Sequence, residues 1–293
     1  MTEISRRAPP TSAVALVPEI DITLTGTPRH IAQSSGIECT ANSACPTVYQ
    51  NRRRATPASW CIIQRPTHRI NGAYAVKVDI EQEIQRSAED AARNIRLLLA
   101  EKKVFAVNLI SSPGSGKTTL IERTIEAFRG KLRVSVIEGD IETDIDAARI
   151  RKHGVQVHQI NTRSSCHIPP FLLLSALERI DLDATDLLFV ENVGNLVCPA
   201  EVPLGEDLRV VALSTAEGDE KPLKYPLVFK TSGMLVITKT DLLPYVRFDM
   251  DRVKAAARAA NPRVEIFETS SVTGTGLSSF VGRVGELCRE KTG

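Results

Sequence analysis

The chain has few aromatic residues, no excess of one charge and no long apolar run, and each shortage excludes a class of protein. Aromatic residues make up 4% of its 293 residues, with one Trp, too few for a stacking platform on single-stranded nucleic acid. Lys and Arg number 37 against 35 Asp and Glu, so the net charge of +2 supports neither a nucleic-acid partner nor a membrane surface. No apolar stretch approaches the roughly 20 residues that span a bilayer.

The amino terminus is a poor signal peptide. Arg6 and Arg7 precede the apolar residues 13–17, but this stretch is short and Pro18 interrupts it. A cytoplasmic protein is therefore predicted. In a reducing compartment its six cysteines are expected to be thiols, available to metals or packed in the core.

Two parts differ in composition. Residues 1–75 are interrupted by seven prolines and predict a low-order, largely disordered N-terminal extension. Residues 76–293 predict one folded domain. It begins with an amphipathic helix over residues 78–103, where apolar side chains recur at steps of three and four.

Strand-like and helix-like segments alternate after residue 103. This alternation predicts an α/β fold with a doubly wound, mostly parallel sheet and helices on both faces. The predicted strands cover residues 104–110, 132–137, 155–160, 187–190, 208–213, 234–237 and 264–267. The predicted helices cover residues 118–128, 144–152, 169–180, 249–260 and 277–291.

A phosphate-binding loop is predicted where the first strand meets the next helix. Glycines there let backbone N–H groups converge on phosphate oxygens, and a Lys reaches the β- and γ-phosphates. A Thr hydroxyl is placed for Mg²⁺. Ser111 stands where the usual motif has Gly, and the alternative is an ordinary Gly-rich turn with a surface Lys. The loop residues are Gly114, Ser115, Gly116, Lys117, Thr118 and Thr119.

Two carboxylates at strand ends complete a predicted Mg²⁺ site. Asp140 and Glu191 follow apolar strands, and oxygen ligands suit this ion. A helix N-cap is the alternative for Asp140 and the favoured interpretation of Asp144. Gly194 is predicted to donate its N–H to the γ-phosphate. The predicted catalytic residues are Lys117, Thr118, Asp140 and Glu191, and without a water-positioning Gln or an arginine finger hydrolysis is expected to be slow.

A guanine site is predicted from two later segments. After the strand at residues 234–237, Asp241 can accept hydrogen bonds from the guanine N1–H and exocyclic amine, and Lys239 would lie over the base. Thr238 stands where such motifs usually have Asn. Ser270 and Ser271 resemble the loop whose backbone contacts the guanine O6.

A second metal site is predicted from three soft ligands. Cys166 and His167 lie in one loop and Cys198 in another, and both loops are expected at the carboxyl ends of strands. Two thiolates and an imidazole suit Zn²⁺ or Ni²⁺. The alternative is that these cysteines are small buried apolar residues.

Together these segments resemble HypB, a family of SIMIBI-class GTPases that incorporate nickel into hydrogenase. The resemblance covers about residues 77–290, and the segments from Glu191 and Glu217 separate it from the urease accessory GTPase. It implies GTP, Mg²⁺ and Zn²⁺ or Ni²⁺ as ligands, a GTP-dependent homodimer, and metal ligands at Cys166, His167 and Cys198. It also implies a HypA-type nickel chaperone and the hydrogenase large-subunit precursor as partners.

The chain departs from this family in three places. It has neither a Cys-rich amino-terminal motif nor a His-rich stretch, and its five His make nickel storage unexpected. The residues after His167 differ from the usual run, and Thr238 replaces Asn. Two alternatives stay open: a GTP-dependent accessory protein for another metalloenzyme, and a metal-binding scaffold with a degenerate nucleotide site.

Overall fold

The structure is a computed structural model that describes residues 80–140, 144–163 and 165–293. The expected extension over residues 1–75 lies outside these ranges. Seven strands are described: β1 (Phe105–Ser111), β2 (Val134–Asp140), β3 (Gln156–Asn161), β4 (Leu187–Glu191), β5 (Leu208–Ser214), β6 (Met234–Thr238) and β7 (Glu265–Glu268).

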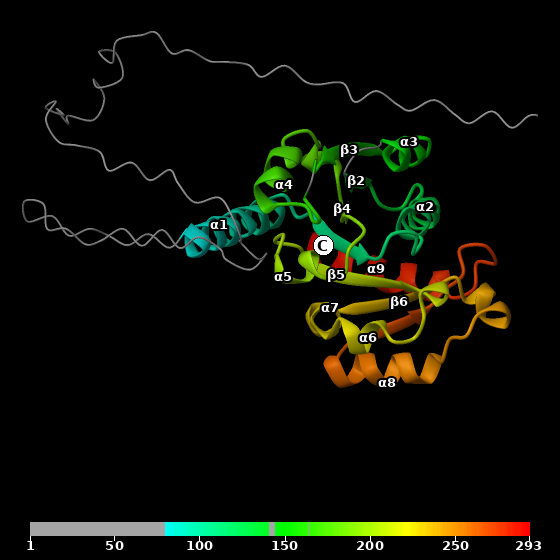
Figure 1. Cartoon of the computed structure of the whole chain (residues 1–293). Helices are drawn as coiled ribbons and strands as arrows, with labels where there is room; N and C mark the ends of the chain where they lie inside the picture. Colours follow the sequence, from blue (N-terminus) through cyan, green and yellow to red (C-terminus); the bar gives the residue numbers. More distant parts are fainter. Residues whose placement is uncertain (1–79, 141–143, 164) are drawn as a thin grey trace, which may run out of the picture. The chain divides into compact units, whose positions relative to one another are not determined.

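The helices alternate with these strands (Figure 1). The α-helices are α1 (Ile80–Glu101), α2 (Lys117–Phe128), α3 (Ile145–Arg151), α4 (Pro170–Leu177), α5 (Cys198–Glu201), α6 (Lys221–Lys224), α7 (Pro226–Thr231), α8 (Met250–Ala260) and α9 (Leu277–Thr292). Three short 3₁₀ helices are η1 (Leu182–Ala184), η2 (Thr215–Glu217) and η3 (Thr240–Tyr245).

The strands form one sheet in the order β3-β2-β4-β1-β5-β6-β7. All six neighbouring pairs are parallel, so every carboxyl end lies at the same edge. The chain winds first from β1 toward β3 and then returns to build β5, β6 and β7 on the other side. The topology therefore switches at β1, which is where doubly wound sheets bind their ligands.

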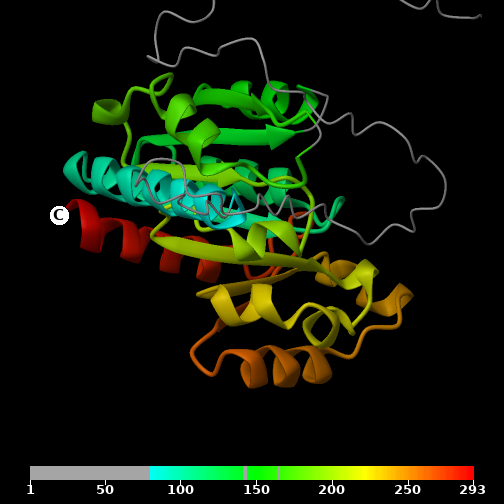
Figure 2. The same ribbon diagram turned by 60° about the vertical axis from the view of Figure 1, so that its left-hand side comes forward.

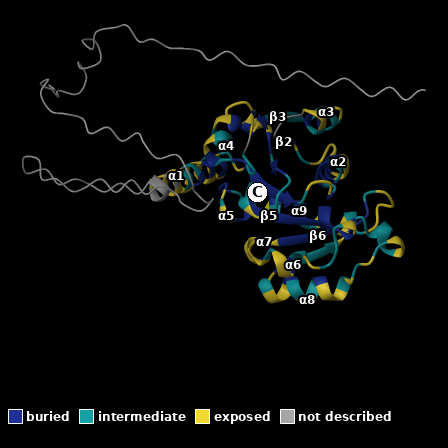
Figure 3. Cartoon of the chain, in the orientation of Figure 1, coloured by how far each residue is buried: buried dark blue, intermediate teal, exposed yellow. Residues whose placement is uncertain are grey.

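Alternating side chains bury both faces of the sheet. In β1, Val107 and Leu109 belong to an apolar cluster with α2 and α9, whereas Ala106 packs in a second cluster with α1 and α4. Ile110 joins a third cluster, which α7 and α8 share on this second face. The strands are accordingly buried and the outer helix surfaces exposed (Figure 3). Figure 2 shows α9 running alongside the strands to the carboxyl terminus.

The predicted fold class is confirmed, with seven parallel strands and helices on both faces. Every predicted strand is present, displaced at its ends by three residues at most. The three short helices α5, α6 and α7 were not predicted, because four to six residues with an early Pro show no helical periodicity. None of the helices in the described residues is long and apolar enough to cross a membrane.

Candidate nucleotide and metal site

The predicted phosphate loop connects β1 to α2. Gly114 and Gly116 have φ of 75° and 91°, a backbone conformation that side chains other than Gly rarely adopt. The Lys117 amino group is buried and donates to Ser111 Oγ at 3.0 Å. Ser111, the departure from the usual motif, thus holds the lysine in the loop. The Thr119 hydroxyl accepts a hydrogen bond from Arg149 of α3 at 3.1 Å.

Thr118 and Glu191 meet in the interior beside this loop. Thr118 Oγ1 donates to Glu191 Oε1 at 2.8 Å, and both residues are buried. Burial, opposed by Lys117 and by the Thr118 hydrogen bond, raises the pKa of Glu191 to about 7. The second carboxylate oxygen of Glu191 has no hydrogen-bond partner among the described residues. This oxygen therefore lacks a cation or a hydrogen-bond donor.

Glu138 is a further buried carboxylate here, one to which the sequence analysis gave no role. It is the register partner of Glu191 on the adjacent strand, and its Oε2 likewise lacks a partner in the described chain. Burial, then the charges of Glu191 and Asp140, raise the pKa of Glu138 to about 8. The period of two along β2 places Glu138 and Asp140 on one face, which is the signal that could have identified it.

These oxygens fit a Mg²⁺ ion. Two buried carboxylates with an unpartnered oxygen each, beside a Thr hydroxyl, supply the hard oxygen donors that this ion prefers. Asp140 ends β2 at the same edge of the sheet, and the N-cap of α3 is Asp144. The helix-cap alternative for Asp140 is thus wrong. Asp144 occupies the expected cap position, although its side chain makes no capping hydrogen bond.

Gly194 lies against the phosphate loop. A Cβ built on Gly194 would stand 3.0 Å from the backbone nitrogen and Cα of Pro113. The segment that follows β4 thus reaches the phosphate loop through a position where only Gly fits. The role of Gly194 at a terminal phosphate stays a prediction.

The predicted guanine residues gather next to the loop. Lys239 Nζ donates to the Gly114 carbonyl at 2.6 Å, and Thr238 Oγ1 donates to the Ser115 carbonyl at 2.6 Å. Asp241 Oδ1 accepts a hydrogen bond from the Ser270 hydroxyl at 2.5 Å. The structure therefore brings the two predicted segments together.

Ser271 and the segment at η2 also border this site. The Ser271 carbonyl accepts a hydrogen bond from Arg123 Nε at 3.2 Å. Glu217 accepts from the Ser115 hydroxyl at 2.7 Å, and Lys221 Nζ donates to Ser112 Oγ at 3.4 Å. The segment that begins at Glu217 entered the sequence analysis through the family resemblance only. The contacts of Glu217 and Lys221 show that this segment lies against the phosphate loop.

Cys166, His167 and Cys198 form one half-buried group. Their ligand atoms lie within 4.8 Å of one another, and Asn195 Nδ2 donates to Cys198 Sγ at 3.4 Å. Burial, opposed by Glu201, lowers the pKa of His167, which favours the neutral imidazole that binds metals. The Cys166 and Cys198 sulfur atoms lie directly against each other, with the Cα atoms 6.3 Å apart, a separation from which two cysteines can form a disulfide or share a metal ion. As thiolates they and the His167 imidazole form a donor set that suits Zn²⁺ or Ni²⁺.

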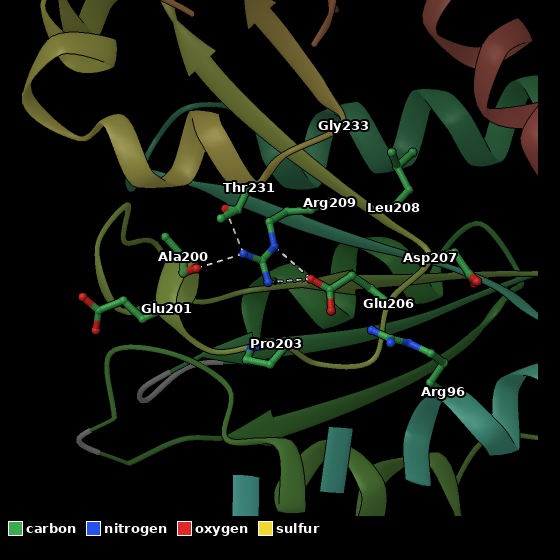
Figure 4. Close-up of a pocket in the computed structure, with 10 residues that line it drawn as sticks. All are labelled: Arg96, Ala200, Glu201, Pro203, Glu206, Asp207, Leu208, Arg209, Thr231 and Gly233. Carbon is green, nitrogen blue, oxygen red and sulfur yellow. Dashed lines mark hydrogen bonds and ion pairs between the residues drawn. The ribbon is translucent and has the colours of Figure 1, made fainter. Parts of the chain in front are cut away.

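A cavity of about 410 Å³ lies elsewhere, beside the starts of β5 and β6 (Figure 4). It is at the amino ends of these strands, away from the phosphate loop. The Arg209 guanidinium in its wall donates to Glu206 and to the Ala200 carbonyl, both at distances below 3 Å. The cavity lies away from the phosphate loop, and we assign no part of the nucleotide site to it.

A phosphate loop at the switch point of a parallel sheet, with a carboxylate and a hydroxyl paired behind it, defines a P-loop nucleotide-binding protein. Residues 105–268 match the family described as CobW/HypB/UreG, nucleotide-binding domain. The chain belongs to this family and, within it, to the HypB group.

Individual relatives agree with this assignment. The hydrogenase maturation factor HypB of Escherichia coli K12 is 44% identical over 206 residues, 70% of each chain. The crystal structure of HypB from Helicobacter pylori in complex with nickel is 36% identical, with a TM-score of 0.67 over 70% of this chain and 96% of that one. The HypB structure from Archaeoglobus fulgidus is 35% identical, with a TM-score of 0.66 over 69% of this chain and 99% of that one.

Proposed function

We propose that this protein is a GTP-hydrolysing metallochaperone that assists nickel insertion into the large subunit of [NiFe] hydrogenase. The observation that carries the proposal is the short segment after β4. It has Glu191, the hydrogen-bond partner of Thr118, at one end and Cys198 of the Cys/His group at the other. A nucleotide sensor and a metal ligand thereby share one loop.

Nucleotide binding is assigned to the residues around the phosphate loop. Lys117 would contact the β- and γ-phosphates, while backbone N–H groups between Gly114 and Thr119 surround them. Asp241, oriented by Ser270, would accept the two guanine donors and reject adenine, which lacks that pair. Lys239, whose amino group donates to the Gly114 carbonyl, would lie over the base.

Hydrolysis is assigned to the same edge of the sheet. Mg²⁺, held by Thr118 with Asp140 and Glu191, would neutralise charge that develops on the phosphates. Gly194 would donate its N–H to the γ-phosphate, and loss of that phosphate would free the loop toward Cys198. Neither a Gln nor an Arg is placed to orient water among the described residues assigned to this site. Turnover is therefore expected to be slow until a homodimer or partner completes it.

Nickel is treated as the cargo of the Cys/His group. The support is the soft donor set of Cys166, His167 and Cys198 and the nickel in the structure of the Helicobacter pylori relative. Zn²⁺ suits the same ligands. A HypA-type chaperone and the hydrogenase large-subunit precursor are the proposed partners, and the cytoplasm is the proposed location. The Escherichia coli relative is a hydrogenase maturation factor, which supports these partners.

The decisive experiment measures GTP hydrolysis with Mg²⁺ in the parent protein and in two variants. Lys117→Ala should lose more than about 100-fold in turnover, since it removes the charge at the phosphates. Asp241→Asn should lose GTP affinity and accept xanthosine triphosphate instead, because an amide can donate to the xanthine C2 carbonyl. GTP turnover that survives both substitutions would refute the assignment.

Two alternatives are separated by further measurements. A gene deletion that abolishes hydrogenase activity, restored by excess nickel, supports the hydrogenase client, whereas unchanged activity favours another metalloenzyme. A scaffold with a degenerate nucleotide site predicts metal binding without any GTP turnover, even with partner present. The side-chain hydrogen bonds that position Lys117, Thr118 and Asp241 favour a GTP-hydrolysing enzyme over such a scaffold.

A further inference from the structure

A buried hydrogen-bond chain begins directly after the metal ligand His167. The Ile168 backbone N–H donates to Asn192 Oδ1 at 3.1 Å. The Asn192 side-chain amide donates in turn to Asn108 Oδ1 at 3.2 Å. Both asparagines are buried, with 0% exposure for Asn108 and 1% for Asn192. The Cys166–His167 loop is thus tied to the central strand β1.

The chain continues from β1 to the segment of the other metal ligand. The Asn108 amide donates to Glu206 Oε1 at 3.2 Å, and Arg209 Nε donates to the same oxygen at 2.8 Å. Arg209 Nη1 then donates to the Ala200 carbonyl at 2.9 Å, inside α5, which begins with Cys198 (Figure 4). Five hydrogen bonds therefore connect the backbone after His167 to the backbone after Cys198.

The position of Asn108 requires an explanation, because amides are costly in apolar interiors. Its neighbours on the same face of β1 are Ala106 and Ile110, which belong to two separate apolar clusters. Burial of an unpartnered amide is unfavourable where burial of an apolar side chain is favourable, and only a complete set of hydrogen bonds offsets the cost. The partners of Asn108 are Asn192 and Glu206, which lead to the two ligand segments.

Ile168 is also fixed from a third direction. Its side chain is fully buried, and a Cβ on Gly139 would stand 2.5 Å from Ile168 Cγ1. Gly139 precedes Asp140, and Asn192 follows Glu191. The residue after the metal ligand His167 therefore contacts the neighbours of both proposed Mg²⁺ carboxylates.

We propose that Asn108 and Asn192 are positioning residues of the metal site: their hydrogen bonds hold the Cys166–His167 segment at a fixed distance from the Cys198 segment. This arrangement presents the three ligands to a soft divalent cation without reorganisation of the loops. The metal part rests on the proposed function, whereas the distance between the two thiols is a property of the chain alone.

The test uses two variants of the full-length protein and a matched control. Asn108→Ala removes the central amide, and Asn108→Leu replaces it with a side chain of similar volume suited to a buried strand, so that folding is retained. Thr185→Val is the control, because it breaks a buried hydrogen bond, Thr185 to Ser135 at 2.8 Å, that has no link to the metal ligands.

Two quantities are measured. The first is the equilibrium of the reduced protein with oxidised glutathione, in which formation of the Cys166–Cys198 bond releases two glutathione thiols; it reports how often the two sulfurs meet. The second is Zn²⁺ and Ni²⁺ affinity of the reduced protein, by competition with a chromophoric chelator. The equilibrium constant for disulfide formation and the metal affinities should each fall about tenfold in each Asn108 variant. They should stay within twofold of the parent in Thr185→Val.

The outcomes separate this inference from the proposed function. The inference would be overturned if the Asn108 variants, shown to be folded by circular dichroism and urea unfolding, stayed within twofold of the parent in the glutathione equilibrium. An equal fall in Thr185→Val would also overturn it, since the effect would then be general loss of stability. A parent that binds neither metal refutes the metallochaperone, while the glutathione equilibrium still decides the role of Asn108.

Discussion

Thr238 at the end of β6 donates its hydroxyl to the backbone carbonyl of Ser115 at 2.6 Å and so joins the guanine segment to the phosphate loop. Both residues are buried, and the bond spans more than a hundred residues of sequence. The residue that departs from the usual Asn of this motif thus makes a specific contact with the loop that follows β1.

Thr238→Val should break this contact while keeping the shape of the side chain. The Ser115 carbonyl loses a buried donor, at a cost of about 1 kcal/mol in the free energy of unfolding. We expect GTP affinity to fall about three- to tenfold by isothermal titration. Thr231→Val, at an exposed threonine of α7, is the control. A Thr238 variant with unchanged stability and affinity would show that the contact contributes nothing.

Glu191→Gln should abolish most hydrolysis with less effect on nucleotide binding. The amide keeps the shape next to Thr118 but removes the charge that we assign to Mg²⁺. We expect turnover to fall more than about 100-fold, which corresponds to about 2.7 kcal/mol in the barrier. The measurement is phosphate release against Mg²⁺ concentration. Glu178→Gln, on the exposed end of α4, should behave as the parent, and turnover above a tenth of the parent in Glu191→Gln would contradict the assignment.

Gly194→Ala tests the contact between the switch segment and the phosphate loop. A methyl group at this position meets the Pro113 backbone at 3.0 Å, so one of the two segments must move. Affinity for a non-hydrolysable GTP analogue should fall more than tenfold, and GDP affinity less, because only the former has a γ-phosphate. Gly282→Ala in α9 is the matched control, since a Cβ there meets no atom within 4 Å. Equal losses of affinity for both nucleotides would show that the substitution distorts the loop as a whole and does not act through the γ-phosphate.

Asp186 should stabilise the protein only above acidic pH. Hydrogen bonds from the Arg133 side chain and backbone lower the pKa of Asp186. A carboxyl group with a lowered folded pKa contributes stability above its unfolded pKa of about 4 and loses it as pH falls through the folded value. Asp186→Asn should therefore cost about 1 kcal/mol at pH 7 and progressively less below pH 4, by urea unfolding.

The control for this pH dependence is Asp183→Asn. Asp183 pairs with Lys102 at 2.9 Å, but its side chain is 77% exposed. Solvent screens such pairs, so its removal should change stability by less than about 0.5 kcal/mol at either pH. If Asp186→Asn cost as much at pH 3 as at pH 7, the loss would come from packing and not from charge.

Bound metal should change nucleotide affinity, and nucleotide should change metal affinity by the same factor. The reason is the short segment that connects Glu191 to Cys198. In the reduced protein, Cys198→Ala should lower Zn²⁺ affinity more than tenfold and remove the effect of Zn²⁺ on GTP affinity. Cys288→Ala, at a buried cysteine of the α9 cluster, should retain both. Titrations of GTP at several fixed Zn²⁺ concentrations measure the coupling, and identical GTP affinities throughout would disprove it.

Much of this fold could be predicted because its strands are mostly apolar runs that alternate with helical patterns. Residues 187–190 and 234–237 are short and apolar, and they lie in β4 and β6. The phosphate loop could be predicted because its residues are consecutive in the sequence, between a strand and a helix, so that no contact with a distant segment was needed to recognise it. The short helices α5 to α7 could not be predicted, because their conformation depends on packing against the second face of the sheet.

The polar contacts in the interior could not be predicted from the sequence. Asn108 interrupts an apolar strand, and that anomaly is its only signal; the partner Glu206 lies 98 residues away. Glu138 shares a face with Asp140, but its missing partner appears only when β2 and β4 are side by side. Contacts between distant segments depend on register, which the sequence pattern alone does not specify.

The direct contact between the Cys166 and Cys198 sulfurs makes the candidate metal group sensitive to oxidation. A disulfide between them would remove the thiolate charges with which these residues would bind an ion. Under the proposed function, oxidised protein would lose metal binding while the phosphate loop, which involves neither sulfur, stayed intact. A measurement of GTP hydrolysis alone would therefore not report whether the metal group is competent.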